Sequence, residues 1–137
     1  MLTHTLTREM ETGPDICDIT GDLQVLVDKS GIITGIVQIF IPGATGSVTA
    51  LEYEPGVVED LKRAINELAP PDRLYDHELA WHDGNGHSHV QAALLGPSIS
   101  VPVRKSELAL GTWQQIVVIN HDNGPRSRKI EITIIGN

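Results

Sequence analysis

The sequence predicts an α+β, β-rich domain, an antiparallel or mixed β-sandwich with two or three short helices packed on it. Segments rich in β-branched residues outnumber segments in which apolar residues follow helical spacing. Glycine and proline also interrupt the chain at short intervals, so each element has to be short. The chain has 137 residues and contains no repeat or linker, which predicts one domain over residues 1–137.

The N-terminal elements are predicted from the spacing of apolar residues and from residues typical of helix ends. Apolar and polar residues alternate over residues 2–7, which predicts a strand. Helical spacing follows over residues 20–30, with Thr20 as the expected N-cap and Gly31 as the residue that ends the helix. Residues 35–41 are almost wholly apolar and β-branched, a composition typical of a strand buried on both faces.

The middle of the chain predicts a strand and the best-marked helix. Residues 47–53 are expected to pair with residues 35–41, joined to them by the small-residue loop 43–46. Pro55 suits the first turn of a helix over residues 55–68, and Pro70 and Pro71 end it. Its expected buried stripe consists of Val57, Leu61, Ala64, Ile65 and Leu68.

The last part of the chain returns to strands. Residues 88–95 predict a short third helix closed by Gly96. Strands are expected at residues 98–103, 112–120 and 129–135, and the turn sequence at 122–125 joins the last two.

Charge and hydropathy exclude several classes of partner. The formal net charge is −8 and there is no basic run, which argues against binding to nucleic acid or to anionic membranes. No apolar run approaches the ~20 residues of a membrane span. The first eleven residues lack the pattern of a secretory signal, and the single Cys17 fits a reducing compartment, so we expect a cytoplasmic protein.

Histidines provide the strongest chemical signal. Four of the six lie within residues 77–89. His87 and His89 are two residues apart, so an extended backbone would point both imidazoles to one side, and His77 could return as a third ligand. Three protein ligands would hold a divalent metal, expected to be zinc, and leave an open coordination position. The alternative is that the loop histidines are solvated or that one packs on Trp81.

Two further segments contain groups suited to an anion, and nearby acids could serve in acid–base chemistry. Residues 43–47 offer backbone N–H groups and hydroxyls, although a plain turn would look the same. Arg126 and Arg128 could place two guanidinium groups on one face of a strand, toward phosphate or toward acidic residues of the chain itself. Carboxylates that could orient an imidazole or exchange a proton, or could simply be solvated, are Glu52, Asp76, Glu78 and Asp83.

Three segments together resemble the YjbQ-like family, whose members carry the label secondary thiamine-phosphate synthase. They are residues 83–98, the Leu-Gly-Thr-Trp-Gln-Gln run at 110–115, and Gly-Pro-Arg-Ser-Arg at 124–128. The resemblance extends from about residue 18 to residue 136. It implies a β-rich, jelly-roll-like α+β fold, a homotrimer and a metal site. The apolar strands 35–41 and 115–119 would supply the surface for a trimer.

The resemblance also implies roles for individual residues. Most family members have Pro-His-Thr-Thr where this chain has Pro42-Gly43-Ala44-Thr45, so one histidine of the family is absent here. We expect His87 to replace it, which makes His77, His87 and His89 the ligand set. Glu52 falls on a family glutamate and is the candidate catalytic residue. The candidate residues for phosphate or substrate binding are Thr45, Thr112, Gln114, Arg126 and Arg128.

The function expected from the sequence is a metal-dependent enzyme acting on small phosphorylated metabolites, with thiamine-phosphate synthesis as the named reaction. That reaction joins a pyrimidine methyl pyrophosphate to a thiazole phosphate, and the departing pyrophosphate needs cationic neutralisation. One alternative is a non-catalytic trimeric housekeeping protein that binds a metal or ligand. Another is a metal-dependent hydrolase.

Overall fold

The computed structural model describes residues 1–137 and contains two antiparallel sheets and four helices. The five-stranded sheet has the order β1 (Leu2–Met10), β8 (Arg126–Gly136), β3 (Thr34–Phe40), β5 (Ser98–Arg104), β6 (Glu107–Leu108). The three-stranded sheet has the order β2 (Asp15–Asp18), β7 (Gln115–Asn120), β4 (Gly46–Leu51). The expected α+β, β-rich class is confirmed. All strand pairs are antiparallel, so the sheets are not mixed.

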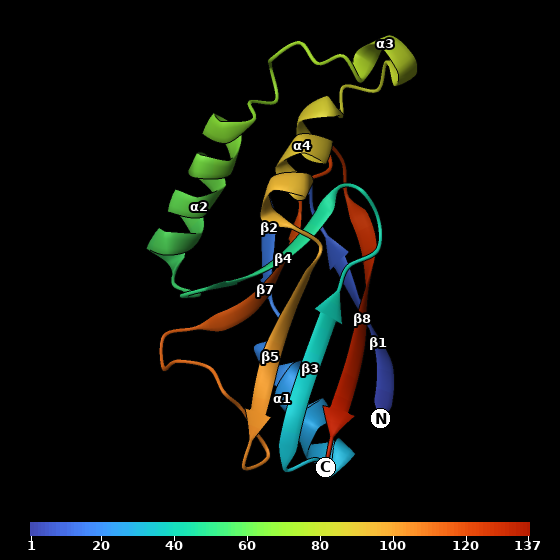
Figure 1. The fold of residues 1–137 in the computed structure, drawn as a ribbon. Helices are drawn as coiled ribbons and strands as arrows, with labels where there is room; N and C mark the ends of the chain where they lie inside the picture. The colour runs from blue at the N-terminus through green and yellow to red at the C-terminus, as the bar shows by residue number, and fades with distance from the viewer.

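The helices lie toward opposite ends of the sheets (Figure 1). Helix α1 (Thr20–Ser30) lies near the end where β3 begins, whereas α2 (Pro55–Leu68), α3 (Glu78–Trp81) and α4 (Gly86–Leu95) gather toward the other end. The three predicted helices are confirmed, and α4 begins two residues before its predicted start. Helix α3 was not predicted, because four residues are too few to show a helical period. None of the helices is both long enough and apolar enough to cross a membrane.

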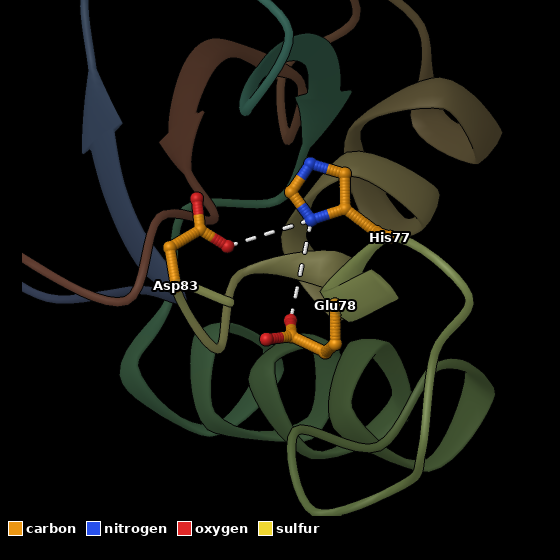
Figure 2. A group of neighbouring side chains, drawn as sticks. All are labelled: His77, Glu78 and Asp83. Carbon is orange, nitrogen blue, oxygen red and sulfur yellow. Dashed lines mark ion pairs between the residues drawn. The ribbon is translucent and has the colours of Figure 1, made fainter. Parts of the chain in front are cut away.

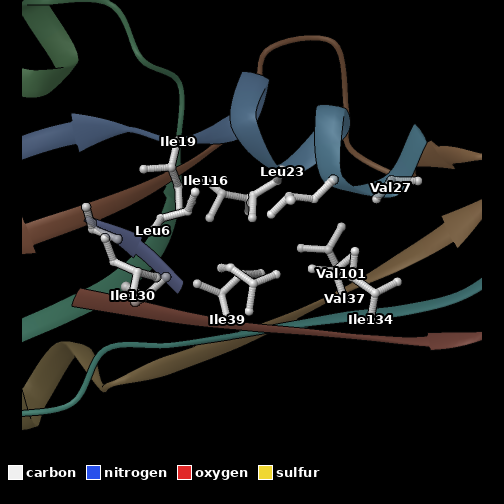
Figure 3. Packing of buried hydrophobic residues seen from close by; sticks show 14 of the residues in the cluster. Leu6, Ile19, Leu23, Val27, Val37, Ile39, Val101, Ile116, Ile130 and Ile134 are labelled. Atoms are coloured by element: carbon white, nitrogen blue, oxygen red, sulfur yellow. The ribbon is translucent and has the colours of Figure 1, made fainter. Parts of the chain in front are cut away.

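The main hydrophobic core lies between the five-stranded sheet and a layer formed by α1 and the three-stranded sheet (Figure 3). Leu23, Leu26 and Val27 of α1 are buried, as their spacing predicts. From the sheet, Val37 and Ile39 of β3 point into the same core. This layer arrangement explains why β-branched residues dominate the sequence, since they pack well on a pleated surface.

Strand β7 is the strand that is buried on both faces. Its residues Ile116 and Val118 belong to the main core, whereas Val117 and Ile119 belong to a second cluster under α2 and α4. The prediction that residues 35–41 would be covered on both sides is wrong. Alternate residues of β3, such as Ile36, are exposed because no element covers the outer face of the five-stranded sheet.

The expected pairing of residues 47–53 with residues 35–41 is also wrong. Strand β3 pairs with β5 and β8, whereas β4 pairs with β7 in the other sheet. The loop between β3 and β4 therefore crosses from one sheet to the other, and so does the loop between β7 and β8. The two crossing loops meet at one end of the molecule, where the backbone N–H of His121 donates to the carbonyl of Thr45 at 2.8 Å.

Helix ends differ in part from the sequence-based expectations. Thr20 is the first helical residue of α1 rather than its N-cap, and its N–H donates to the carboxylate of Asp18 at 2.9 Å. The Thr20 hydroxyl instead accepts from the backbone of Ile116 in β7, so a long-range contact competes for the capping group. Gly31 ends α1 with a φ of 71°, as predicted.

Helix α2 begins at Pro55, as predicted, and the side chain of Glu54 caps it by accepting from two backbone N–H groups. Of the predicted stripe, Ile65 is buried and Leu61 packs against the second cluster. Leu68 is exposed. Only part of the apolar face of α2 packs against the rest of the protein, and Leu68 lies outside that part.

Candidate metal and anion site

A pocket of about 410 Å³ opens at the end of the molecule where the two crossing loops meet. Four segments line it: the loop after β3, the α3 region, helix α4 and the start of β8. These segments are far apart in sequence, so the fold assembles the pocket. Its lining consists of Gly43, Ala44, Thr45, His77, Trp81, Asp83, Asn85, His89, Arg126 and Arg128.

Two of these lining residues, His77 and Asp83, belong to a group of ligand atoms suited to a divalent cation. His77, Glu78 and Asp83 each offer an atom within 4.8 Å of the others (Figure 2). Nδ1 of His77 lies 3.4 Å from a carboxylate oxygen of Asp83 and 4.0 Å from one of Glu78. This nitrogen is buried and has no hydrogen-bond partner. An unpartnered imidazole nitrogen between two carboxylates fits a bound divalent metal, since these are the ligand types of zinc and similar ions.

Backbone groups hold the two carboxylates in place. Glu78 accepts from the N–H of Gly84 at 2.8 Å and from that of Gly86 at 3.4 Å. Asp83 accepts from the N–H of Asn85 at 3.1 Å. Each carboxylate oxygen has more than one acceptor position, so these bonds orient the groups and still leave lone pairs for a cation.

The structure separates His87 from His89. The extended backbone assumed for residues 87–89 is wrong, because both residues lie in α4. Two residues along a helix are about 200° apart around its axis, so the two imidazoles leave α4 on different sides. His89 lines the pocket, and its ring centroid is 4.4 Å from that of His77.

His87 instead points into the protein. It is 6% exposed, is absent from the pocket lining, and has an unpartnered Nδ1. Burial lowers the pKa of His87, although the nearby carboxylates of Asp122 and Glu78 oppose this effect. The pocket thus contains two of the three expected ligands, His77 and His89.

Two arginines form the cationic part of the pocket lining. Arg126 and Arg128 are alternate residues of β8 and both line the pocket. Arg128 is 7% exposed, and its Nε and Nη2 donate to the side chains of Asn120 and Thr45. Nη1 donates no hydrogen bond within the protein and lies beside Gly43, where a Cβ would come within 3.3 Å of it. A buried guanidinium with one free nitrogen in a pocket is suited to an anion.

Asp122, which the sequence did not single out, organises this side of the pocket. One carboxylate oxygen accepts from Asn85 at 3.1 Å and from Thr45 at 3.0 Å, and the same oxygen pairs with Arg126 at 3.0 Å. Burial alone would raise the pKa of Asp122, but these three hydrogen bonds and the charge of Arg126 hold it below its ordinary value. An ionised Asp122 therefore fixes three residues that line the pocket. A turn aspartate carries no sequence signal that distinguishes this role.

A buried histidine lies behind the pocket. His121 Nε2 is 2.7 Å from the Ser47 hydroxyl, and its Nδ1 is 3.0 Å from Oε1 of Gln91. The Gln91 amide nitrogen donates to Ala69, so Oε1 accepts from Nδ1–H and Ser47 donates to Nε2. Burial, followed by the charge of Arg128, lowers the pKa of His121 to about 4. None of the three side chains lines a pocket, so they act as a neutral cross-link between α4, β4 and the crossing loop.

The remaining predicted site residues lie elsewhere. Glu52 and Thr112 line a second pocket of about 460 Å³ together with Trp113. Gln114 is beside it and accepts from the N–H of Gly111 at 3.0 Å. Strand β4 begins at the first pocket and ends next to Glu52, and six extended residues span roughly 20 Å. Within one chain, the fold therefore does not bring Glu52 to the histidines.

Known proteins match nearly the whole chain. The family pattern described as "UPF0047 protein YjbQ-like" matches residues 4–137. A UPF0047 protein of Archaeoglobus fulgidus is 35% identical over 125 residues, which are 91% of this chain and 94% of that protein. The UPF0047 protein YugU of Bacillus subtilis is 34% identical over 134 residues, 96% of this chain and 98% of that protein.

Solved structures agree with this match. A hypothetical protein of Aeropyrum pernix K1 has a TM-score of 0.93 at 32% identity, with all of both chains covered. A YbjQ-like protein of unknown function from Sulfolobus solfataricus P2 has a TM-score of 0.89 at 34% identity, with 99% of both chains covered. These likenesses concern sequence and fold, and they assign no reaction to the chain.

The depressed pKa of His121 predicts a pH-dependent stability. Between its ordinary pKa of 6.5 and its folded value of about 4, the unfolded chain binds a proton that the folded chain does not. This contribution is therefore present above pH 6.5 and is lost as the pH falls toward 4, by roughly 3 kcal/mol of unfolding free energy.

Urea denaturation at a series of pH values measures this loss. His121→Gln should flatten the dependence in that window, whereas the same change at the exposed His4 should not. An identical pH dependence in wild type and His121→Gln would contradict the assignment.

Proposed function

The chain belongs to the UPF0047 YjbQ-like family, and on this basis we propose that it is a metal-dependent enzyme acting on small phosphorylated metabolites. The observation that carries the proposal is the composition of one pocket, which is lined by His77, Asp83 and His89 together with Arg126 and Arg128. Metal ligands and guanidinium groups in one pocket suit a phosphate or pyrophosphate substrate, because its several negatively charged oxygens have to be neutralised.

The residues in and beside the pocket have two separate roles, metal binding and anion binding. His77, Glu78 and Asp83 would hold the divalent ion, and His89 borders the same space. When bound, such an ion supplies Lewis-acid neutralisation of phosphate oxygens. The free Nη1 of Arg128 binds the anion. Thr45 and Asn120 keep that guanidinium from moving, since both accept hydrogen bonds from it.

The named reaction is thiamine-phosphate synthesis, to which the family label points. It brings two phosphorylated partners together and releases pyrophosphate, so it needs cations on both sides of the leaving group. The roles proposed for Thr45, Arg126 and Arg128 fit the first pocket. Glu52, Thr112 and Gln114 lie outside it, so we propose that they act on substrate at this pocket only from a neighbouring copy of the chain.

A homotrimer is the assembly that we propose. Ile36 of β3 and Ile135 of β8 are paired neighbours on the outer face of the five-stranded sheet, and they are 51% and 57% exposed. Phe40 is exposed further along the same strand. An apolar face of this kind is typical of a protein–protein interface. Residues 115–119 do not contribute, because β7 is buried on both faces.

A non-catalytic trimeric protein that binds a metal or ligand is the second candidate. The position of Glu52 favours it, because the expected acid–base residue is absent from the pocket of the same chain. A coordination shell filled by protein atoms would support this candidate. A metal-bound water in the pocket would support the enzyme.

The metal site predicts specific losses of zinc. After incubation with zinc and dialysis, the wild-type chain should retain stoichiometric zinc, measured by plasma emission, and His77→Ala should lose it because a central ligand is removed. His82→Asn serves as the matched control, since His82 is an exposed neighbour with a φ of 53°, which asparagine tolerates.

The variants His87→Ala and His89→Ala distinguish two expectations: the ligand set implied by the family resemblance predicts similar losses for both, whereas the pocket contains only His89 and predicts a loss for His89→Ala alone. Full zinc occupancy in His87→Ala would remove His87 from the set. Full occupancy in His77→Ala would refute the metal site itself.

The anion side predicts a separate effect. Arg126→Ala should weaken binding of inorganic phosphate by about 1.5 to 3 kcal/mol while zinc content stays unchanged, because a charged hydrogen-bond donor is lost. Isothermal titration of the zinc-loaded protein measures this. Arg63→Ala, on the exposed side of α2, should have no effect. Unchanged phosphate affinity in Arg126→Ala would exclude the proposed anion site.

The trimer is tested by light scattering. The wild-type protein at micromolar concentration should have the mass of three chains, and Ile36→Asp should dissociate it because a charge is placed in an apolar interface. Val25→Asp changes an exposed residue of α1 and should leave the trimer intact. A monomeric wild-type protein would contradict the proposal.

A further inference from the structure

The geometry points to a subsite for a compact apolar group beside the candidate metal and anion site, so that the preferred ligand is a phosphate ester with a ring-sized apolar part. This inference rests on the proposed function, because the anion is held by the same pocket. It adds the place where the organic part of such a ligand would lie and the residues that would select it.

The subsite is a recess of about 240 Å³. Gly43, Ala44 and His89 line both this recess and the larger pocket, so the two hollows share a boundary at these residues. The rest of the recess is lined by Ala92, Ala93 and other residues without charged side chains. Polar and charged side chains predominate in the lining of the larger pocket, whereas the recess has none apart from His89, which lies at the boundary.

Small side chains on α4 keep one wall of the recess open. His89, Ala92 and Ala93 are related by three and four residues, so they lie on one face of the helix. Ala92 is buried, whereas Ala93 is exposed at the rim. A larger apolar residue at Ala93 would therefore fill the entrance without entering the core.

Another part of the recess lining comes from the segment that contains Gly43 and Gly46. Gly43 has a φ of 109°, which side chains rarely adopt. At Gly46 a Cβ would come within 2.9 Å of the side chain of Ile41. Gly43 is thus required by the backbone, and a side chain at Gly46 would need the buried Ile41 side chain to shift. The two glycines present no side chain that could fill the recess.

The position of the free arginine nitrogen links the recess to the anion. Nη1 of Arg128 lies beside Gly43, which borders both hollows. A phosphate bound at Nη1 would lie next to the recess, whose lining, apart from His89 at the boundary, has no polar side chain to stabilise a second charge. Complete ligand pockets have volumes of about 300 to 1,000 Å³, and an apolar cavity of about 150 Å³ can hold benzene. A recess of this size therefore suits one ring rather than a whole ligand.

Titration of the zinc-loaded protein with inorganic phosphate and with phenyl phosphate tests the inference. Phenyl phosphate should bind about tenfold more tightly to the wild-type protein, because its ring leaves water for the recess. Ala93→Leu should remove this advantage and leave the affinity for inorganic phosphate unchanged. Ala64→Leu makes the same substitution at an exposed position of α2 outside both hollows, and it should keep the advantage.

Two results would overturn the recess alone. Phenyl phosphate could bind no more tightly than inorganic phosphate, or Ala93→Leu could weaken both probes equally in a protein whose thermal unfolding is unchanged. If the wild-type protein binds neither probe, the anion site fails, and the proposed function and the inference are both refuted.

Discussion

The buried carboxylate of Asp122 is the interaction on which the candidate site depends. It lies on the loop between β7 and β8 and binds Thr45 on the other crossing loop, Asn85 before α4, and Arg126 on β8. A buried charge is costly unless it is paired and hydrogen-bonded, so these partners are held in a single arrangement. That arrangement positions the cationic side of the pocket relative to the α3 region, which carries the metal-ligand atoms.

The two crossing loops can meet because of how the sheets are covered. Strand β7 is buried between the main core and the cluster under α2 and α4, which fixes the three-stranded sheet between two apolar layers. Each crossing loop then spans the short distance between the sheets, and His121 joins them to α4 through Ser47 and Gln91. Rigid strands and helices thus position a site built largely from loops, and functional residues commonly lie on loops supported in this way.

The site combines three environments at one end of the fold. Imidazole and carboxylate groups face the cavity from the α3 region, guanidinium groups face it from β8, and an apolar recess opens beside His89. A phosphate ester has parts that match each environment: a charged group that needs cations and an organic part that leaves water. The second pocket, with Glu52, is separate in a single chain, so an assembly of several chains would decide whether the two act together.

Local signals in the sequence determined the class of fold, the three longer helices, most strands and the grouping of Arg126 with Arg128. These features depend on residues within one or two turns, or on the alternation of a single strand. Tertiary structure alone decided that β3 and β4 belong to different sheets, that α4 turns His87 inward, and that Asp122 organises the pocket. Those outcomes depend on contacts between residues far apart in the chain. In addition, side chains two residues apart point to the same side of a strand but to different sides of a helix. Residue types and spacing therefore identified the candidate ligands, whereas packing determined which of them lie in the same pocket.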